Sequence, residues 1–187
     1  GLGGPPEPNA RVESDRTSIN AGESVNFDAR ASTSPESTVI TEYRWNFDDG
    51  QRSETVQGYT SHTFTEAGVY EIRVTVVNDL DGEDTASTTL VVNGFPKISL
   101  SMPTAIRTGD VVTLDASGSS DPENGELTTV WDLDWNVDSD NDGDPTNDND
   151  AMGEIHHFTP YESGNYTGSV TVTDESDASA TRMWNLS

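Results

Sequence analysis

The stretch Gly68-Val-Tyr-Glu-Ile-Arg-Val-Thr-Val76 decides the fold class of this chain. From Tyr70 onward its apolar residues fall on every second position: Tyr70, Ile72, Val74 and Val76. Because successive side chains of a β-strand point to opposite faces, this period of two predicts a strand that covers a core on one side. The stretch Gly164–Val172 repeats the pattern, and no apolar face with a period of 3.6 persists through three turns. The sequence therefore predicts an all-β fold.

Three further segments occur twice in the same order, so the chain contains an internal repeat. The aligned pairs, in chain order, are Ala21–Glu23 with Thr108–Asp110, Val25–Glu36 with Val112–Glu123, and Trp45–Asp48 with Trp131–Asp134. Ordered matches along both halves indicate two tandem copies of one domain. We predict domains at residues 9–93 and 94–187, preceded at residues 1–8 by a linker or by added residues that belong to no domain.

The segment Trp45-Asn-Phe-Asp-Asp-Gly50, followed by His62-Thr-Phe64 and the strand to Val76, resembles a polycystic kidney disease (PKD) domain. That family carries a Trp-Asp-Phe-Gly-Asp-Gly turn before a Tyr-x-Val-x-Leu-x-Val strand. The resemblance implies an immunoglobulin-like antiparallel β-sandwich of seven strands in each copy, with Trp45 and Trp131 in the two cores. The first copy departs from the pattern at Asn46 and Asp48, and the second replaces the later turn residues by an acidic loop.

The charge balance points to cations as partners. The formal net charge is −25, from 34 acidic and 9 basic residues, which disfavours nucleic acid and anionic membrane as partners. Two explanations stay open: specific divalent sites, or an acid-rich surface adapted to a salty, halophilic medium. Cysteine is absent, so disulfides and thiolate metal sites are excluded. No apolar run is long enough for a transmembrane helix, so we expect no membrane insertion.

The acidic loop at residues 138–150 (DSDNDGDPTNDND) predicts a calcium site. Asp138, Asp140 and Asp142 stand at positions 1, 3 and 5 of a calcium-loop template, and Gly143 stands at the sixth, where the chain turns sharply. The alternative is a solvated acidic insertion that binds nothing. The predicted Ca²⁺ ligands of this loop are Asp138, Asp140, Asp142 and Asp144, with either Asp148 or Asp150 completing the shell.

A second calcium site is implied by the resemblance alone. Some PKD domains, notably those similar to collagenase modules, hold calcium through a Ser-x-Asp-Pro-Asp-Gly segment, a later acidic residue and a linker residue. The matching positions are Asp121, Glu123, Asp174 and, in the linker, Asn93. In the first copy the counterparts are Ser34, Glu36 and Asn78, so two of the acidic ligands are missing there.

No catalytic motif accompanies these sites. His62 fits a structural hydrogen bond, and the adjacent His156 and His157 point to opposite faces of a strand and cannot chelate one ion. We therefore expect no enzyme activity but a calcium-rigidified spacer or protein-interaction module, extracellular or at the cell surface, as in surface-layer or adhesion proteins. Other surface proteins or glycans would be its partners, and the chain would be a monomeric part of a larger multidomain protein. The alternative is an accessory module of a secreted hydrolase that binds carbohydrate or protein substrate.

Overall fold

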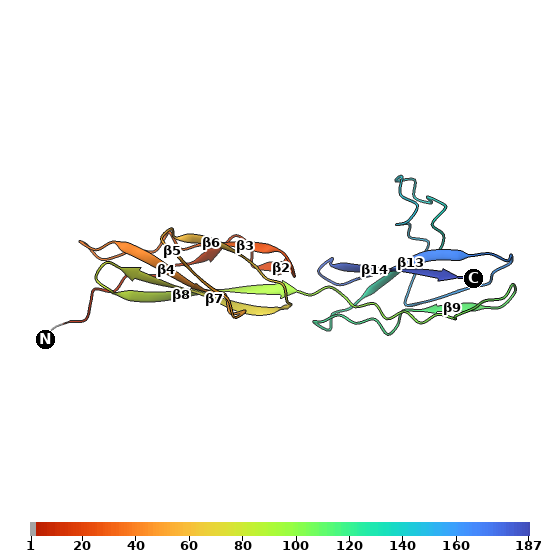
Figure 1. The fold of residues 1–187 in the computed structure, drawn as a ribbon, viewed down its shortest axis with the longest axis horizontal. Coiled ribbons are helices and arrows are strands. Elements are labelled where there is room, and N and C mark those ends of the chain that lie inside the picture. The colour runs from red at the N-terminus through yellow and green to blue at the C-terminus, as the bar shows by residue number, and fades with distance from the viewer. Residues whose placement is uncertain (1–2) are drawn as a thin grey trace. The chain divides into compact units, whose positions relative to one another are not determined.

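The computed structural model describes residues 3–187 and consists of β-strands joined by turns and loops, with no helix among these residues. The all-β prediction is confirmed. The chain divides into two compact units between Asn93 and Gly94 (Figure 1). Residues 1 and 2 of the predicted linker lie outside the described residues. A search of residues 3–187 for helices long and apolar enough to cross a membrane found none.

The first unit is a sandwich of two sheets. One sheet has the strand order β1-β3-β6 and the other has the order β2-β8-β7-β4-β5. Its strands are β1 (Glu13–Ser14), β2 (Ser18–Asn20), β3 (Ser24–Asp28), β4 (Ile40–Asn46), β5 (Arg52–Thr55), β6 (Tyr59–Thr63), β7 (Gly68–Asn78) and β8 (Glu83–Asn93). All pairs in this unit are antiparallel except β2 with β8, which run parallel from Ser18 opposite Val91. The parallel pair arises because the chain leaves one sheet after β1 and joins the edge of the other as β2.

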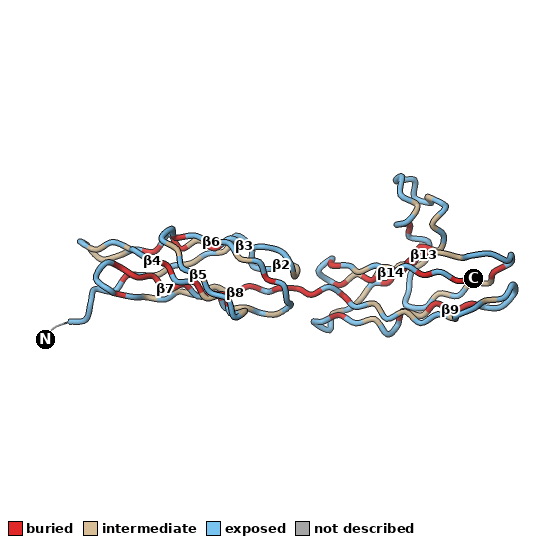
Figure 2. Tube along the Cα trace, in the orientation of Figure 1, coloured by how far each residue is buried: buried red, intermediate tan, exposed pale blue. Residues whose placement is uncertain are grey.

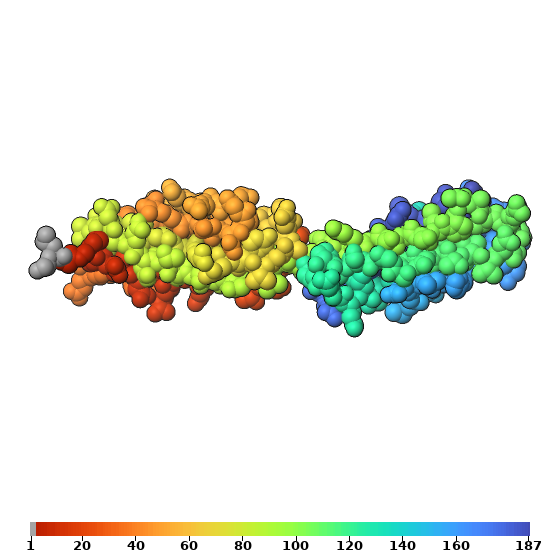
Figure 3. All heavy atoms as spheres, turned by 90° about the horizontal axis from the view of Figure 1, so that it is seen from below, coloured from red at the N-terminus to blue at the C-terminus, as the bar shows by residue number. Residues whose placement is uncertain are grey.

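The second unit is a sandwich of the same kind with fewer strands. Its sheets have the orders β11-β10-β13-β14 and β12-β9. The strands are β9 (Val112–Asp115), β10 (Thr128–Asp132), β11 (Ala151–Met152), β12 (Ile155–Phe158), β13 (Tyr166–Thr173) and β14 (Ser179–Leu186). The segment between Gly94 and β9, green in Figure 3, pairs with the rest of this sandwich only at isolated β-bridges. These join Lys97 to Ser120 and Ser101 to Asp115.

The family resemblance implies seven strands a copy, whereas the described chain has eight in the first unit and six in the second. The first unit gains one because its N-terminal strand is broken in two. The second unit has fewer because its opening segment makes only single bridges and no strand.

Each unit has its own apolar core, and the predicted tryptophans lie in them. Trp45 is 1% exposed in the first core and Trp131 is 0% exposed in the second. The alternation in β7 is also confirmed, because Ile72, Val74 and Val76 are fully buried. Trp184 packs in the second core as well.

The apolar residues of Trp131–Val137 alternate as in a strand, but β10 covers only the first two of these residues. β10 ends at Asp132, and the following residues form turns. The carboxylates explain the break: Asp132 Oδ1 accepts the amide of Asp134 (3.1 Å), and Asp134 Oδ1 accepts the amide of Asn136 (3.2 Å). Short acidic side chains that bind the backbone two residues on compete with the hydrogen bonds of a sheet.

Candidate metal centre

The acidic loop connects β10 to β11 and projects from the second unit (Figure 1). Its base is fixed to the end of β10, where the amide of Asp150 donates to the Trp131 carbonyl (2.9 Å) and the amide of Leu133 donates to Asp150 Oδ2 (2.8 Å). Figure 2 shows the loop largely exposed, with a buried stretch near its base. The two ends of the loop are therefore held together by hydrogen bonds at the end of β10.

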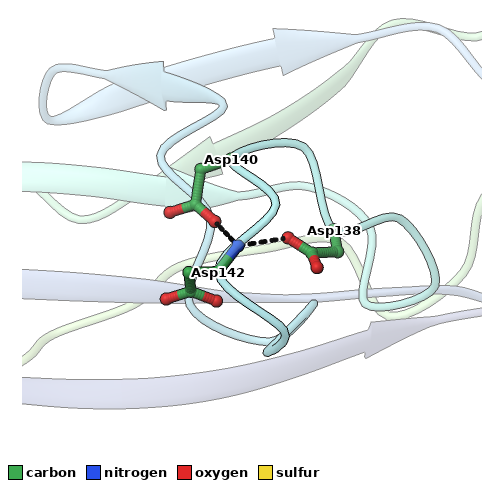
Figure 4. Close-up of side chains that lie close together, drawn as sticks. All are labelled: Asp138, Asp140 and Asp142. Carbon is green, nitrogen blue, oxygen red and sulfur yellow. Dashed lines mark hydrogen bonds between the residues drawn. The ribbon is translucent and has the colours of Figure 1, made fainter.

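Three of the predicted ligands come together in this loop. One carboxylate oxygen from each of Asp138, Asp140 and Asp142 lies within 4.8 Å of the others. The amide of Asp142 donates to Asp138 Oδ1 (3.1 Å) and to Asp140 Oδ1 (3.0 Å), so both side chains turn toward the same point of the backbone (Figure 4). The amide of Gly143 adds a bond to Asp138 Oδ2 (3.0 Å). This acidic trio, Asp138, Asp140 and Asp142, forms a cluster of hard oxygen atoms of the type that calcium binds.

Two residues between and after the trio take left-handed backbone conformations. Asn141 has φ 61° and Gly143 has φ 99°. Asparagine and glycine are the residues that adopt such values at least cost, since glycine lacks a Cβ and asparagine can bond locally. These two turns curl the chain so that alternate carboxylates face inward, as the calcium-loop template requires at its sixth position.

The three carboxylates of the trio carry like charges and repel one another. A hydrogen bond from the Asp142 amide lowers the pKa of Asp140, but desolvation and the negative charges of Asp142, Asp148 and Asp138 outweigh it. The pKa of Asp140 is therefore raised above its ordinary value. A cation at the centre of the trio would remove this repulsion, because an opposite charge favours the ionised form.

The other predicted loop ligands bond to the loop itself. Asp148 is 2% exposed, and its two oxygens accept the amides of Ser139 (2.7 Å) and Asp140 (3.3 Å). Asp150 accepts the Ser139 hydroxyl (3.2 Å) in addition to the Leu133 amide. Asp144 is exposed and accepts the amide and hydroxyl of Thr146. Asp148 and Asp150 thus fix the backbone at Ser139 and Asp140, next to the trio. Their role as calcium ligands stays a prediction.

The second predicted site centres on Asp121, which is only 7% exposed. Its Oδ2 accepts the amides of Glu123 (2.9 Å) and Gly125 (2.7 Å), whereas its buried Oδ1 has no hydrogen-bond partner. An added Cβ at Gly125 would lie 3.3 Å from Asp121 Oδ2 and 3.6 Å from Glu175 Oε2. Asp121 and Glu175 therefore flank the same glycine, and Glu175 is a neighbouring carboxylate that sequence reasoning did not single out.

The remaining members of that predicted site make hydrogen bonds within their own units. Glu123 is exposed and its Oε1 accepts the amide of Gly94 (3.0 Å). Asp174 is 7% exposed, and its Oδ1 accepts the amides of Ser176 (2.8 Å) and Ala178 (2.9 Å). Asn93 ends β8 in the first unit, where its Nδ2 donates to Asn20 Oδ1 (3.1 Å). In residues 3–187, Asp121, Glu123 and Asp174 do not form a three-carboxylate group as close as the acidic trio.

Sequence reasoning missed one buried acid. Asp132 is 2% exposed, and its Oδ2 has no hydrogen-bond partner. Burial raises the pKa of Asp132, the hydrogen bond from the Asp134 amide lowers it, and the charges of Asp150, Asp148 and Asp134 raise it further, to about 6. The aligned residue of the first copy is the neutral Asn46, which accepts the Asp48 amide (3.1 Å) in the same way. This difference between the copies was the signal available in the sequence.

The side chains of His62 and His157 make hydrogen bonds within their own units. His62 Nε2 lies 2.6 Å from Asp49 Oδ2, and the His62 ring stacks on Phe47 with the ring centroids 3.9 Å apart. His156 and His157 follow one another on β12, and His157 Nδ1 lies 2.9 Å from the Thr113 hydroxyl. The structural hydrogen bond predicted for His62 is present.

Comparison with known proteins places the first unit in a family. Residues 5–94 match the family model described as "PKD domain". Residues 5–94 are a PKD domain. Collagenase ColA of Clostridium perfringens is 35% identical over 81 residues, which are 43% of this chain and 7% of the collagenase. The chain therefore corresponds to a small part of that relative.

Solved structures were compared as well. The PKD1 domain of the Vibrio cholerae metalloprotease PrtV is 30% identical, with 46% of this chain and 96% of that chain covered and a TM-score of 0.39. A C-terminal fragment of intimin, solved in complex with the intimin-binding domain of Tir, is 16% identical, with 93% of this chain and 62% of that chain covered and a TM-score of 0.53. The intimin likeness shows the fold of tandem β-sandwiches and nothing further. The second unit shares the aligned repeat with the PKD domain of the first.

Proposed function

We propose that this chain is a calcium-binding structural module of an extracellular or cell-surface protein, in which it acts as a rigidified spacer or protein-interaction domain. The observation that carries the proposal is the acidic trio, in which one carboxylate oxygen from each residue lies within 4.8 Å of the other two. Calcium takes six to eight oxygen ligands and accepts irregular geometry, so three carboxylates with backbone oxygens and water would suffice.

Electrostatics favours a bound ion over an empty loop. Two unit charges about 4 Å apart interact by about 1–4 kcal/mol at the dielectric of water or of a protein surface. In the acidic trio all these interactions are repulsive, and no basic residue occurs between Asp138 and Asp150. A divalent cation turns the repulsion into attraction and selects one loop geometry.

The environment of Asp121 supports a second cation in the second unit. A buried carboxylate oxygen without a hydrogen bond leaves the cost of its desolvation uncompensated, and a bound cation would compensate it. Asp174 and Glu123 of the same unit would complete this site.

An extracellular location fits both the family and the ion. Calcium sites of extracellular modules commonly have dissociation constants of about 10⁻⁴–10⁻³ M, which suit an exposed loop that is not enclosed by helices. The PKD relative Collagenase ColA is named for activity on collagen, an extracellular protein. Since cysteine is absent, disulfides do not stabilise these small sandwiches, and bound calcium would serve the same purpose.

Calorimetric titration of the whole chain with calcium tests the proposal. We expect the wild type to bind calcium and the double variant Asp140→Asn with Asp142→Asn to lose one equivalent. The matched control is Asp110→Asn with Asp177→Asn, which removes the same charge from two exposed positions of the second unit. Equal calcium stoichiometry in all three proteins would show that the acidic trio is a solvated insertion.

A second candidate function is an accessory module of a secreted hydrolase, favoured by the likeness to Collagenase ColA and to the PKD1 domain of PrtV. This role requires binding to an insoluble substrate. Co-sedimentation of the chain with fibrillar collagen and with insoluble polysaccharides, with and without calcium, tests it. Retention on one of these substrates supports the accessory role, and recovery of all the protein in the supernatant supports the spacer.

A further inference from the structure

A polar pocket lies at the base of the acidic loop, separate from the acidic trio. It has a volume of about 440 Å³ and is lined, among others, by Asp132, Asp148, Asn147, Ser169 and Thr171. Its members come from β10, β13, β14 and the returning half of the loop. No basic residue lines it in the described part of the chain.

The pocket exists because the loop covers the outer face of the sheet. Trp131 and Val170 point into the core, so the alternation along β10 and β13 places Asp132 and Ser169 on the opposite face. These two residues are direct partners across the strands. Side chains on such a face normally meet water, yet Asp132 is 2% exposed and Ser169 is 3% exposed. Asp148, also 2% exposed, comes from the loop that lies over them.

Two buried carboxylates thus share a pocket that offers them no positive partner. Asp148 has both oxygens bonded to loop amides, but Asp132 Oδ2 is bonded to nothing. Buried ionised groups are retained in proteins when they are paired with an opposite charge or coordinate a metal. The remaining surface of the pocket is formed mainly by hydroxyl and amide side chains, which are oxygen donors or contacts for bound water.

We propose that this pocket binds a calcium ion, with Asp132 Oδ2 as its principal ligand and Asp148 as its second carboxylate. Water and the hydroxyl or amide oxygens of the pocket supply the remaining ligands. The site goes beyond the proposed function, because it uses neither the acidic trio nor Asp121. It also links the sheet to the loop: Asp148 holds the amides of Ser139 and Asp140, so a cation at Asp148 steadies the base of the trio.

The variant Asp132→Asn tests the proposal, because it keeps the shape of the side chain and removes its charge. In calcium titrations of the whole chain we expect Asp132→Asn to bind one equivalent fewer than the wild type. The equivalent lost by Asp140→Asn with Asp142→Asn must be a different one, so the triple variant loses two. Asp110→Asn serves as the single-charge control. Loss from the trio variant without loss from Asp132→Asn would overturn this inference and leave the proposed function standing.

Thermal unfolding gives an independent reading of the same variant. In chelator at pH 8, Asp132→Asn relieves an uncompensated buried charge, so its melting temperature should exceed that of the wild type. In millimolar calcium the order should reverse, because only the wild type gains the bound ion. An advantage of the variant that calcium does not change would mean that no ion binds at Asp132, and the inference would be wrong.

A measurement on the wild type keeps the proposal testable should Asp132→Asn not fold. Manganese(II) is a paramagnetic stand-in for calcium at oxygen sites and broadens the NMR signals of nearby amides. We expect substoichiometric manganese to broaden Ser169 and Thr171 on β13, and calcium to restore them. Sharp signals for these two residues while the loop amides broaden would contradict a site in this pocket.

Discussion

Asn78 in the first unit and Asp174 in the second hold the backbone in the same way. Asn78 Oδ1 accepts the amides of Leu80 (3.1 Å) and Gly82 (2.8 Å), the residues two and four positions further on. Asp174 Oδ1 accepts the amides two and four positions further on as well, at 2.8 and 2.9 Å. The aligned side chains therefore share one oxygen contact and differ in the second atom, which is a nitrogen in Asn78 and an oxygen in Asp174.

The side-chain nitrogen of Asn78 attracts neighbouring oxygen atoms, as a bound cation would. Nδ2 donates to the carbonyl oxygen of Pro6 (2.7 Å) and reaches Ser34 Oγ (3.4 Å), so it joins the opening segment to the sandwich. Ser34 aligns with Asp121, whose buried Oδ1 has no hydrogen-bond partner. In the first unit, the side-chain amide of Asn78 thus occupies the position at which we propose a calcium ion in the second unit.

The variant Ser34→Asp with Asn78→Asp should convert the first unit to calcium dependence. Without calcium, the amide bond to Pro6 is replaced by a carboxylate that faces a carbonyl oxygen, and we expect the unfolding free energy to fall by about 1–3 kcal/mol. Calcium should restore much of this loss through the new pair of carboxylates. Calorimetric melting with calcium and with chelator measures both effects.

The control for this prediction adds the same two charges elsewhere in the first unit, as Gln51→Asp with Thr65→Asp at exposed turn positions. It should show no calcium-dependent change beyond that of the wild type. If the designed pair responds to calcium no more than the control does, the equivalence of Asn78 and a bound ion is refuted.

The repeat and the alternation of apolar residues were sufficient to predict both sandwiches. Val74 and Trp45 could be assigned to a core because period two fixes which face of a strand each side chain occupies. The clustering of Asp138, Asp140 and Asp142 also followed from the sequence, because their spacing and Gly143 determine the local turn.

The buried environment of Asp132 could not be predicted in this way. Alternation correctly places it on the outer face of β10, opposite Trp131, and an outer face normally meets solvent. Its burial depends on Asp148, which is distant in the sequence and returns over the sheet at the end of an irregular loop. The partnership of His62 with Asp49 is likewise tertiary, since His62 lies on β6 of one sheet and Asp49 in the turn between β4 and β5 of the other.

The pair of Asp49 and His62 predicts how the first unit responds to acid. Burial raises the pKa of Asp49, but the hydrogen bonds from His62 and the Gln51 amide and the charge of His62 lower it below its ordinary value. A carboxyl with a lowered folded-state pKa adds stability above its unfolded pKa of about 3.9, and this stability is lost as the pH falls through the folded-state pKa. Asp49→Asn should therefore be less stable than the wild type at pH 7, and the difference should shrink below about pH 4.

Urea unfolding followed at several pH values between neutrality and acid measures this difference. Asp81→Asn is the control, because Asp81 is exposed and its φ of 60° suits asparagine equally well. It should follow the wild-type pH profile. A gap between Asp49→Asn and the wild type that stays constant down to the most acid pH would show that the contact acts through shape and not through charge.

Gly168 on β13 allows Trp184 and the end of β10 to approach the same point of the backbone. An added Cβ would lie 2.2 Å from the carbonyl oxygen of Asp132 and 2.4 Å from Trp184 Cζ2. Both obstacles are rigid, one being backbone and the other a buried ring, so Gly168→Ala must separate β10 from β13 or displace Trp184. Overpacking of this kind costs about 1–3 kcal/mol, and we expect the second unit to melt at a lower temperature while the first is unaffected.

Gly164→Ala is the matched control, because nothing lies within 4 Å of its added Cβ, and its stability should stay within about 0.5 kcal/mol of the wild type. Since Asp132 lies at the same contact, calcium titration of Gly168→Ala adds a second reading: displacement of β10 should weaken the pocket at Asp132 and leave the acidic trio intact, whereas unchanged melting and binding would show that the sheet absorbs the methyl group without strain.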